Sequence, residues 1–367
     1  MNISKIIIYI MVGFMLLGAA DRCIGNRFGL GKQFEEGFNA MGPLALGMIG
    51  MTSIAPLLGD VIRRIAGPYF RLFGADPVMA GSILLSLDTG GYALAHSMTD
   101  NANLANFSAV LLAPTMGSTI GFGIPVALGI LQKEDCRYFA MGTLSGIIAI
   151  PFGCLIGAFV AGFDMHMAVV NIIPVFFIAL VIALGLAMIP EKMIRGFEWF
   201  SRCIIAIITI ALAIAIFTEL TGITIVQGMT PLSESFLTIG GIAIVLAGAY
   251  PMVYIIIHVA GRPLSAAGKL IGLSATDIGG MIAALANTIP AYGMMKDMTP
   301  LGKIINSAFI SCAGFAFGDY LAFCTGVEPQ LISALLACKL SGGVIGTAIA
   351  CFIFHFQKQT LRTEVIS

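Results

Sequence analysis

Charged residues are scarce in this chain of 367 residues: Asp, Glu, Lys and Arg together make up 10%, against 58% hydrophobic residues. A soluble globular protein carries roughly 25% charged residues, so this chain has too few to cover the surface of a soluble fold of its size. Its apolar runs are long and lack the polar alternation of membrane β-strands. The composition therefore predicts an all-α integral membrane protein, a single polytopic domain over residues 1–367.

The sequence also lacks the motifs of several other functions. Its charges balance, with 19 Lys and Arg against 19 Asp and Glu, and no basic tract is present for nucleic acid. The eight cysteines form no CxxC pair, and the four histidines form no HExxH motif. A P-loop and a GxSxG elbow are absent too, which argues against ATP-driven pumping and serine hydrolysis. We therefore expect no catalytic residues, no metal and no cofactor: the chain is not an enzyme.

Eleven apolar segments follow one another with short connections. They run over residues 4–20, 39–62, 77–97, 105–131, 137–162, 167–189, 200–219, 236–260, 277–296, 303–326 and 331–356. GSILLSLDT at 81–89 is similar to GMIAALANT at 280–288, and LSG at 144–146 returns at 340–342. We therefore expect two related five-segment repeats, 4–162 and 200–356, joined by the linking segment 167–189.

Two segments, 77–97 and 277–296, carry helix-breaking residues at their centres, DTGG at 88–91 and NTIP at 287–290. Glycine pairs and proline interrupt helices, and backbone opened at membrane depth must line a cavity or be buried in protein. Paired interruptions in corresponding places of two repeats point to a transport site. The alternative is an ordinary kinked span with a buried polar residue.

We predict that these two segments re-enter the membrane and that the other nine cross it. Loop Lys and Arg residues then gather mostly on one side, with the N-terminus outside. Five crossings between the starts of the two halves make the repeats inverted. Eleven crossings with the N-terminus inside are the alternative.

Charged residues within spans are costly, about 2.5–3.5 kcal/mol on insertion scales, so each needs a reason. Asp88 lies at the centre of the first interrupted segment, and Asp319 lies late in an apolar span. Two buried carboxylates repel each other, and a cationic ligand would relieve that repulsion. The alternative is a structural ion pair with Lys339, Lys296 or Lys303.

Further candidate residues surround these two acids. Tyr320 would form an aromatic wall for a cation, or serve as ordinary packing. Glu35 and Glu36 precede a span, where a gate and an ordinary helix start are both open interpretations. The hydrogen-bonding side chains at the unwound tips are Thr89, Asn287 and Thr288. The acids near span ends, where solvated carboxylates are ordinary, are Asp21, Asp100, Asp135 and Asp297.

Short motifs spread along the whole chain carry a family resemblance. They are QFEEGF at 33–38 with AMG at 40–42, IPVALGI at 124–130, IPEKMI at 189–194 with GF at 196–197, GAYPMV at 248–253, LAN at 285–287 with IP at 289–290, GMMK at 293–296, GD at 318–319 and GGV at 342–344. Together they resemble the bacterial ethanolamine-utilisation permeases, the EutH family. The resemblance implies a multi-pass permease of the bacterial plasma (inner) membrane that imports ethanolamine by facilitated diffusion.

Ethanolamine also suits the acids. An alkylamine resembles Lys, with a pKa of about 10, and is mostly cationic at neutral pH. Asp88 would bind the ammonium, with Asp319 as a second carboxylate. The expected partners are ethanolamine and membrane lipid, without nucleic acid, and homo-oligomerisation stays open.

Three other functions stay open at this point, one of which, a scaffold for other membrane proteins, would not explain the acids at the breaks. Another is a transporter of another small polar solute, such as a nucleoside, a carboxylate or another amine. An anionic solute would favour Arg or Lys at the unwound tips, where this chain has Asp88 and Asn287. The last is a polytopic membrane enzyme, which would need a metal or nucleophile cluster.

Overall fold

The computed structural model describes residues 3–270 and 272–366, and helices dominate these ranges. The first half contains α1 (Ile3–Cys23), α2 (Leu30–Asn39), α3 (Met41–Arg71), α4 (Val78–Leu84), η1 (Leu87–Gly91), α5 (Tyr92–Met98), α6 (Ala102–Asn106), η2 (Phe107–Gly117), η3 (Thr119–Gly123), α7 (Ile124–Ile130) and α8 (Cys136–Ala161). The rest contains α9 (Met165–Met188), α10 (Pro190–Thr221), α11 (Leu232–Leu270), α12 (Ala275–Ala286), α13 (Thr288–Met294), η4 (Met295–Asp297), α14 (Pro300–Ala313), α15 (Asp319–Val327), η5 (Pro329–Leu331) and α16 (Ile332–Ile366).

Eight helices in the described ranges are long and apolar enough to cross a membrane. They overlap eight of the eleven predicted segments, which confirms the all-α integral membrane class. The other three segments, 77–97, 277–296 and 303–326, are each broken into shorter helices. The sequence predicts the first two interruptions; for 303–326 it predicts one unbroken span, whereas the structure ends α14 at Ala313 and starts α15 at Asp319.

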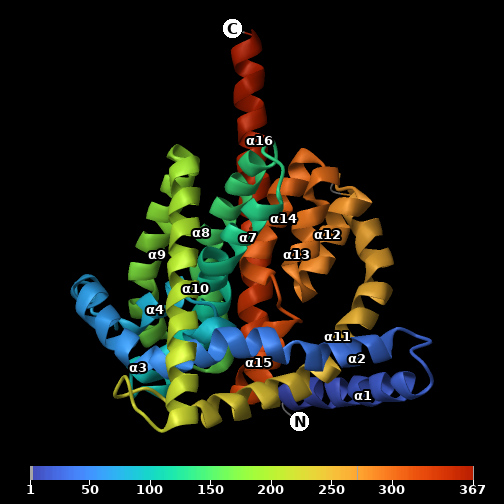
Figure 1. Cartoon of the computed structure of the whole chain (residues 1–367). Helices are drawn as coiled ribbons and strands as arrows, with labels where there is room; N and C mark the ends of the chain where they lie inside the picture. Colours follow the sequence, from blue (N-terminus) through green and yellow to red (C-terminus); the bar gives the residue numbers. More distant parts are fainter. Residues whose placement is uncertain (1–2, 271, 367) are drawn as a thin grey trace.

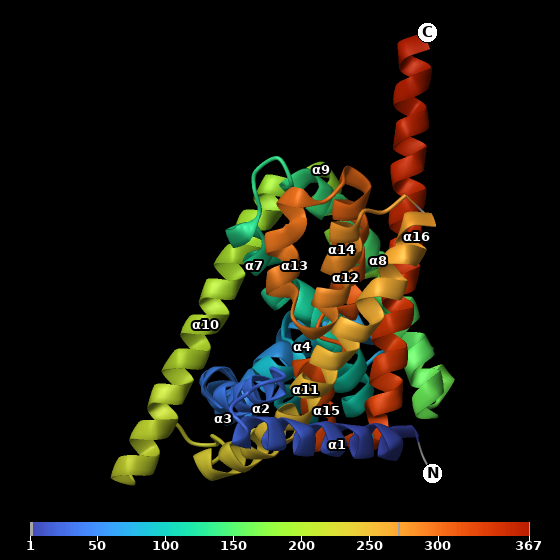
Figure 2. The same ribbon diagram turned by 90° about the vertical axis from the view of Figure 1, so that its right-hand side faces the viewer.

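The centre of the molecule is formed by α8, α14 and α16, which pack against one another (Figure 1). Close packing is possible because Gly153 of α8 faces Gly342 of α16: a Cβ at Gly153 would lie only 3.0 Å from the Gly342 Cα. In both views α1 lies crosswise to α16, beneath the bundle, with α2 beside it (Figures 1 and 2). The amphipathic helix α2 also packs on α11.

The order of elements in 78–161 recurs in 275–366. In each range an interrupted pair (α4–α5, then α12–α13) is followed by shorter helices (α6 to α7, then α14 and α15) and then by a long helix (α8, then α16). The division of the chain into two related halves stays a prediction. Their inversion, and the re-entrant course of the interrupted segments, stay predictions.

The start of α12 is tied to the start of α14 by a buried carboxylate. Asp277 is 0% exposed and accepts hydrogen bonds from the Ser274 N–H at 2.8 Å, the Thr299 N–H at 2.9 Å and the Thr299 hydroxyl at 2.8 Å. Ser274 returns the bond by capping α12 through its hydroxyl. The buried carboxylate therefore accepts from three donors of two segments.

Replacing Asp277 by Ala is expected to lower the thermal unfolding midpoint in detergent by about 5–10 °C. Hydrogen bonds to a charged group contribute about 1.5–3 kcal/mol each, and the unpaired donors add a desolvation cost. The matched control is Asp297→Ala, which changes an exposed aspartate near the same helices. A midpoint for Asp277→Ala equal to that of the control would show that the carboxylate is not structural.

Candidate functional site

The first interruption, between α4 and α5, depends on a glycine with a positive φ. Leu85 and Ser86 are extended, and Gly90 has φ +98°. The Gly91 N–H closes the loop by donating to the Ser86 carbonyl at 2.9 Å. A side chain at Gly90 would collide with α3, because its Cβ would lie 1.9 Å from the Met51 Cγ. The helix therefore opens at the predicted DTGG.

Asp88 lies in this opened stretch and has a serine partner. The Ser86 hydroxyl donates to Asp88 Oδ1 at 2.5 Å and lies 2.8 Å from the Thr89 hydroxyl. Ser86 is itself buried. Ser86 thus connects two predicted site residues, Asp88 and Thr89, through its hydroxyl. Ser86 itself was not predicted from the sequence. A polar residue two positions before the aspartate, within an apolar run, was the available signal.

The second interruption, between α12 and α13, lies at Asn287. This residue is extended, with φ −152° and ψ 129°, and its side-chain oxygen accepts from the Ile289 N–H at 2.9 Å. It therefore serves as the N-cap of α13. Thr288 is buried, and its hydroxyl has no hydrogen-bond partner among the described residues.

The turn between α14 and α15 is bonded to the second interruption. The N–H groups of Phe315 and Phe317 donate to the carbonyls of Ala284 and Leu285, each at 2.9 Å. These carbonyls belong to the last turn of α12, where no helical partner follows. The N–H groups of the turn after α14 therefore bond the free carbonyls at the end of α12. Asp319 follows this turn directly in the chain.

Asp319 begins α15 and receives a hydrogen bond from the Tyr250 hydroxyl of α11 at 2.6 Å. Helix α15 contacts η1, and Asp319 lies within electrostatic range of Asp88. The two candidate carboxylates thus lie on adjoining elements from the two halves of the chain. Tyr250 was missed from the sequence, although it belongs to the GAYPMV motif.

Tyr320 lies in the same cluster, next to Asp319, and its ring is already in contact with a cation. Its hydroxyl donates to the Ser118 hydroxyl at 2.7 Å, and the Lys339 ammonium lies 4.7 Å from the ring centroid. Asn287 and Thr288 lie on the other side of the 314–318 turn: a Cβ at Gly314 would be 2.7 Å from the Thr288 methyl. The six predicted binding residues therefore fall into two groups joined by this turn.

Two of the three lysines proposed as structural partners, Lys303 and Lys339, have direct contacts with groups other than the two candidate acids. Lys303 forms an ion pair with Asp135. The Lys339 ammonium donates to the Pro114 carbonyl, and it makes none of the ion pairs found within 4.0 Å among the described residues. The expectation of a solvated Asp135 is wrong, because this residue is only 3% exposed. It lies at the start of α8 and forms the ion pair with Lys303. Asp21 is equally buried, since it accepts from the N–H groups of the following turn.

The two candidate gate residues have different surroundings. Glu35 forms an exposed ion pair with Arg22 of α1 at 2.7 Å, which ties α2 to α1. Glu36 lies within electrostatic range of Tyr250, the hydroxyl donor to Asp319. Of the two, Glu36 is therefore placed closer to the carboxylates.

A small cavity lies beside the second interruption. It has a volume of ≈ 10 Å³, about that of a single water site. Its lining includes the hydroxyls of Thr143 and Thr288, which have no hydrogen-bond partner among the described residues. Ethanolamine is several times larger than water, so this cavity would have to widen to admit it.

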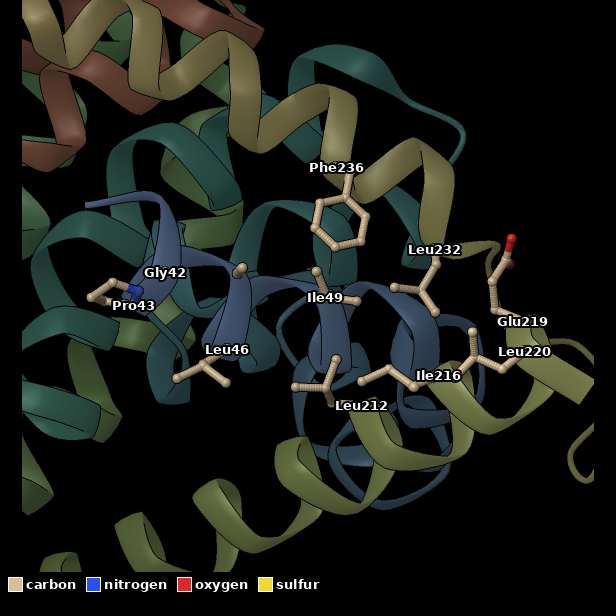
Figure 3. Close-up of a pocket in the computed structure, with 11 residues that line it drawn as sticks. Gly42, Pro43, Leu46, Ile49, Leu212, Ile216, Glu219, Leu220, Leu232 and Phe236 are labelled. Atoms are coloured by element: carbon tan, nitrogen blue, oxygen red, sulfur yellow. The ribbon is translucent and has the colours of Figure 1, made fainter. Parts of the chain in front are cut away.

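A second, much larger hollow is apolar. It measures ≈ 700 Å³ and is bounded by α3, α10 and the start of α11. Figure 3 shows Ile49, Leu212, Ile216 and Phe236 facing it, with the carboxylate of Glu219 at its edge. Such a lining suits hydrocarbon rather than a small hydrophilic amine.

These features define a class of protein: a polytopic helical membrane protein whose broken helices carry carboxylates, an arrangement typical of secondary transporters. In the described part of the chain, no three His, Cys, Asp or Glu side chains gather as metal ligands would. The family described as "Ethanolamine utilisation protein, EutH" matches residues 3–353. The chain belongs to this family and is a multi-pass protein of the bacterial inner membrane.

Curated relatives match over nearly their whole length. The chain is 47% identical over 353 residues to the "Probable ethanolamine permease EutH" of Listeria monocytogenes, covering 96% of this chain and 95% of the relative. It is 40% identical to the protein of the same name in Escherichia coli, covering 99% of each. It is also 42% identical to "Uncharacterized protein YxeR" of Bacillus subtilis, covering 100% of this chain and 99% of the relative. No solved structure matches the chain. The relatives named permeases belong to a class of transporters, not enzymes.

Proposed function

We propose that this protein is an ethanolamine permease that imports ethanolamine across the bacterial plasma membrane. The family and the names of the relatives support a transporter of this solute. The observation that carries the proposal is the placement of Asp88 and Asp319 on adjoining broken elements, within electrostatic range of each other. Two carboxylates without an ion-pair partner within 4.0 Å among the described residues suit a cationic amine better than a neutral or anionic solute.

In this proposal Asp88 binds the ammonium and Asp319 provides the second negative charge. Thr89 shares Ser86 with Asp88, so its hydroxyl is placed to contact the same ligand. Asn287 and Thr288 offer hydrogen bonds to the substrate hydroxyl from the other unwound tip. The hydroxyl of Thr288 is buried, and Thr288 lines the small cavity beside this tip.

The remaining candidates surround the ligand. Tyr320 forms the aromatic wall, and the Lys339 ammonium lies 4.7 Å from the centroid of its ring. Glu36 and Glu35 form the gate on α2. Glu36 would act through Tyr250, and Glu35 through its ion pair with Arg22.

The proposal is tested by uptake of labelled ethanolamine into proteoliposomes at pH about 5.5 and 7.5. Each pH unit lowers the neutral amine tenfold, so passive entry is about a hundredfold smaller at the lower pH. We expect saturable uptake at low pH. Unlabelled ethanolamine should inhibit this uptake by competition, whereas uridine and succinate should not. Competition by uridine or succinate with no effect of ethanolamine would assign a different solute. Conversion of the amine into product without any gradient would indicate an enzyme.

A further inference from the structure

A buried lysine lies next to the proposed amine site. Lys339 is on α16, is 1% exposed, and is among the largest fully buried side chains of the described residues. An ammonium in a protein interior within the membrane is costly and calls for a functional reason. None of the binding or gating roles in the proposed function belongs to Lys339.

The contacts of Lys339 place its charge at the site without neutralising it. Its ammonium donates to the Pro114 carbonyl of η2 and lies 4.7 Å from the centroid of the Tyr320 ring. The thiols around it, Cys154, Cys312 and Cys338, are free cysteines. Lys339 is within electrostatic range of Asp88 but forms no ion pair with it at 4.0 Å or less.

Tyr320 connects this cation to both carboxylates. It directly follows Asp319 in the chain, and its ring carries Lys339. Its hydroxyl interacts with Ser86, which in turn donates to Asp88. The two acids and the lysine therefore belong to one electrostatic unit whose fixed groups, when all are charged, sum to a single negative charge. One singly charged amine would make that unit neutral.

The second interruption offers a neutral counterpart of this arrangement. The LSG motifs at 144–146 and 340–342 align Thr143 with Lys339, and the interrupted segments align Asn287 with Asp88. Thr143 lines the small cavity together with Thr288, which follows Asn287. Each pair thus takes one residue from each half: the acid Asp88 lies with Lys339, and the amide Asn287 lies with the hydroxyl of Thr143. The lysine accompanies the acid, as expected if it serves to balance the charge there.

We propose that Lys339 is a specificity-determining residue, a built-in counter-cation that makes the site accept one singly charged amine and reject doubly charged amines. The proposal rests on the proposed function and adds the charge of the substrate to it. Lys339 does not contact the substrate in this scheme; it acts through Tyr320 and through its field on Asp88. A purely structural lysine, retained to satisfy the Pro114 carbonyl, would leave the charge preference unchanged when replaced.

The test measures how strongly 1,2-diaminoethane competes with labelled ethanolamine for uptake into proteoliposomes at pH about 5.5. This diamine replaces the hydroxyl by a second ammonium at nearly the same size. We expect wild type to be inhibited at least tenfold less strongly by the diamine than by unlabelled ethanolamine. In Lys339→Gln, which removes the charge but keeps a donor, the potency of the diamine relative to ethanolamine is expected to rise at least tenfold. Lys339→Arg, which keeps the charge, should retain the wild-type order.

Several results would overturn the proposal. Equal inhibition of wild-type uptake by the diamine and by unlabelled ethanolamine would overturn it. This result does not depend on the folding of any variant. An unchanged preference in a Lys339→Gln protein that still transports ethanolamine would also overturn it. Absence of saturable ethanolamine uptake by wild type would instead refute the proposed function, so the two failures are distinguishable.

Discussion

Asp88→Asn is expected to reduce the saturable uptake of ethanolamine at pH about 5.5 by at least about 30-fold in kcat/KM. The substitution removes the charge that attracts the ammonium but keeps the shape and a hydrogen-bonding oxygen near Ser86. Removing one partner of a buried charge pair costs about 2–5 kcal/mol, and each 1.4 kcal/mol corresponds to a factor of ten. Uptake should therefore fall nearly to the rate of liposomes without protein.

The matched control for this experiment is Asp297→Asn, which makes the same chemical change at an exposed residue in η4. Its uptake should equal that of wild type. Both variants are first compared by size-exclusion profile and thermal midpoint, so that loss of uptake is not loss of fold. If a folded Asp88→Asn protein transports as wild type does, Asp88 is not the ammonium ligand and the assignment moves to Asp319 or Glu36.

Gly90→Ala should abolish transport and lower the unfolding midpoint by several degrees. The backbone at Gly90 has φ +98°, which costs a non-glycine residue about 1–2 kcal/mol. The new Cβ would also meet Met51, whose Cγ lies 1.9 Å and Cβ 2.4 Å away. Helix α3 or the loop must shift, and either movement displaces Asp88, two residues earlier. Thermal unfolding in detergent and uptake together measure both effects.

Two further variants separate the causes of that loss. Gly293→Ala in α13 is the control, because a Cβ there meets nothing within 4 Å, and it should behave as wild type. In Gly90→Ala combined with Met51→Ala the collision is relieved but the φ cost stays, so stability should recover only in part. A Gly90→Ala protein with wild-type stability and transport would show that the first interruption does not need its left-handed glycine.

The interruptions could be predicted from the sequence because their causes are local. DTGG at 88–91 contains the glycine that takes a positive φ, and NTIP at 287–290 contains the asparagine that caps α13. Composition likewise determines the membrane class, since no other environment suits so few charges. The third interruption was missed because its stabilising bonds are distant in sequence: Phe315 and Phe317 bond to the end of α12. Gly314 and Gly318 alone did not reveal it.

Side-chain partners depend on tertiary structure and were harder to predict. Lys339 and Lys303 were interchangeable candidates in the sequence, yet one lies over Tyr320 and the other pairs with Asp135. Ser86 and Tyr250, the direct hydrogen-bond donors to the two acids, were not singled out. Each is an ordinary polar residue until packing brings it against a carboxylate. The acids themselves could be found, because an isolated charge in an apolar segment is conspicuous without any structure.

The measurement that tests the central claim most directly is calorimetric binding of ethanolamine to the purified protein, wild type, Asp88→Asn, Asp319→Asn and the double variant. We expect wild type to bind one ethanolamine, and each single variant to bind at least tenfold more weakly. The double variant should lose less than the product of the two single losses, because residues that act on one ligand couple. Binding by both single variants with wild-type affinity would contradict the account, since neither carboxylate would then hold the amine.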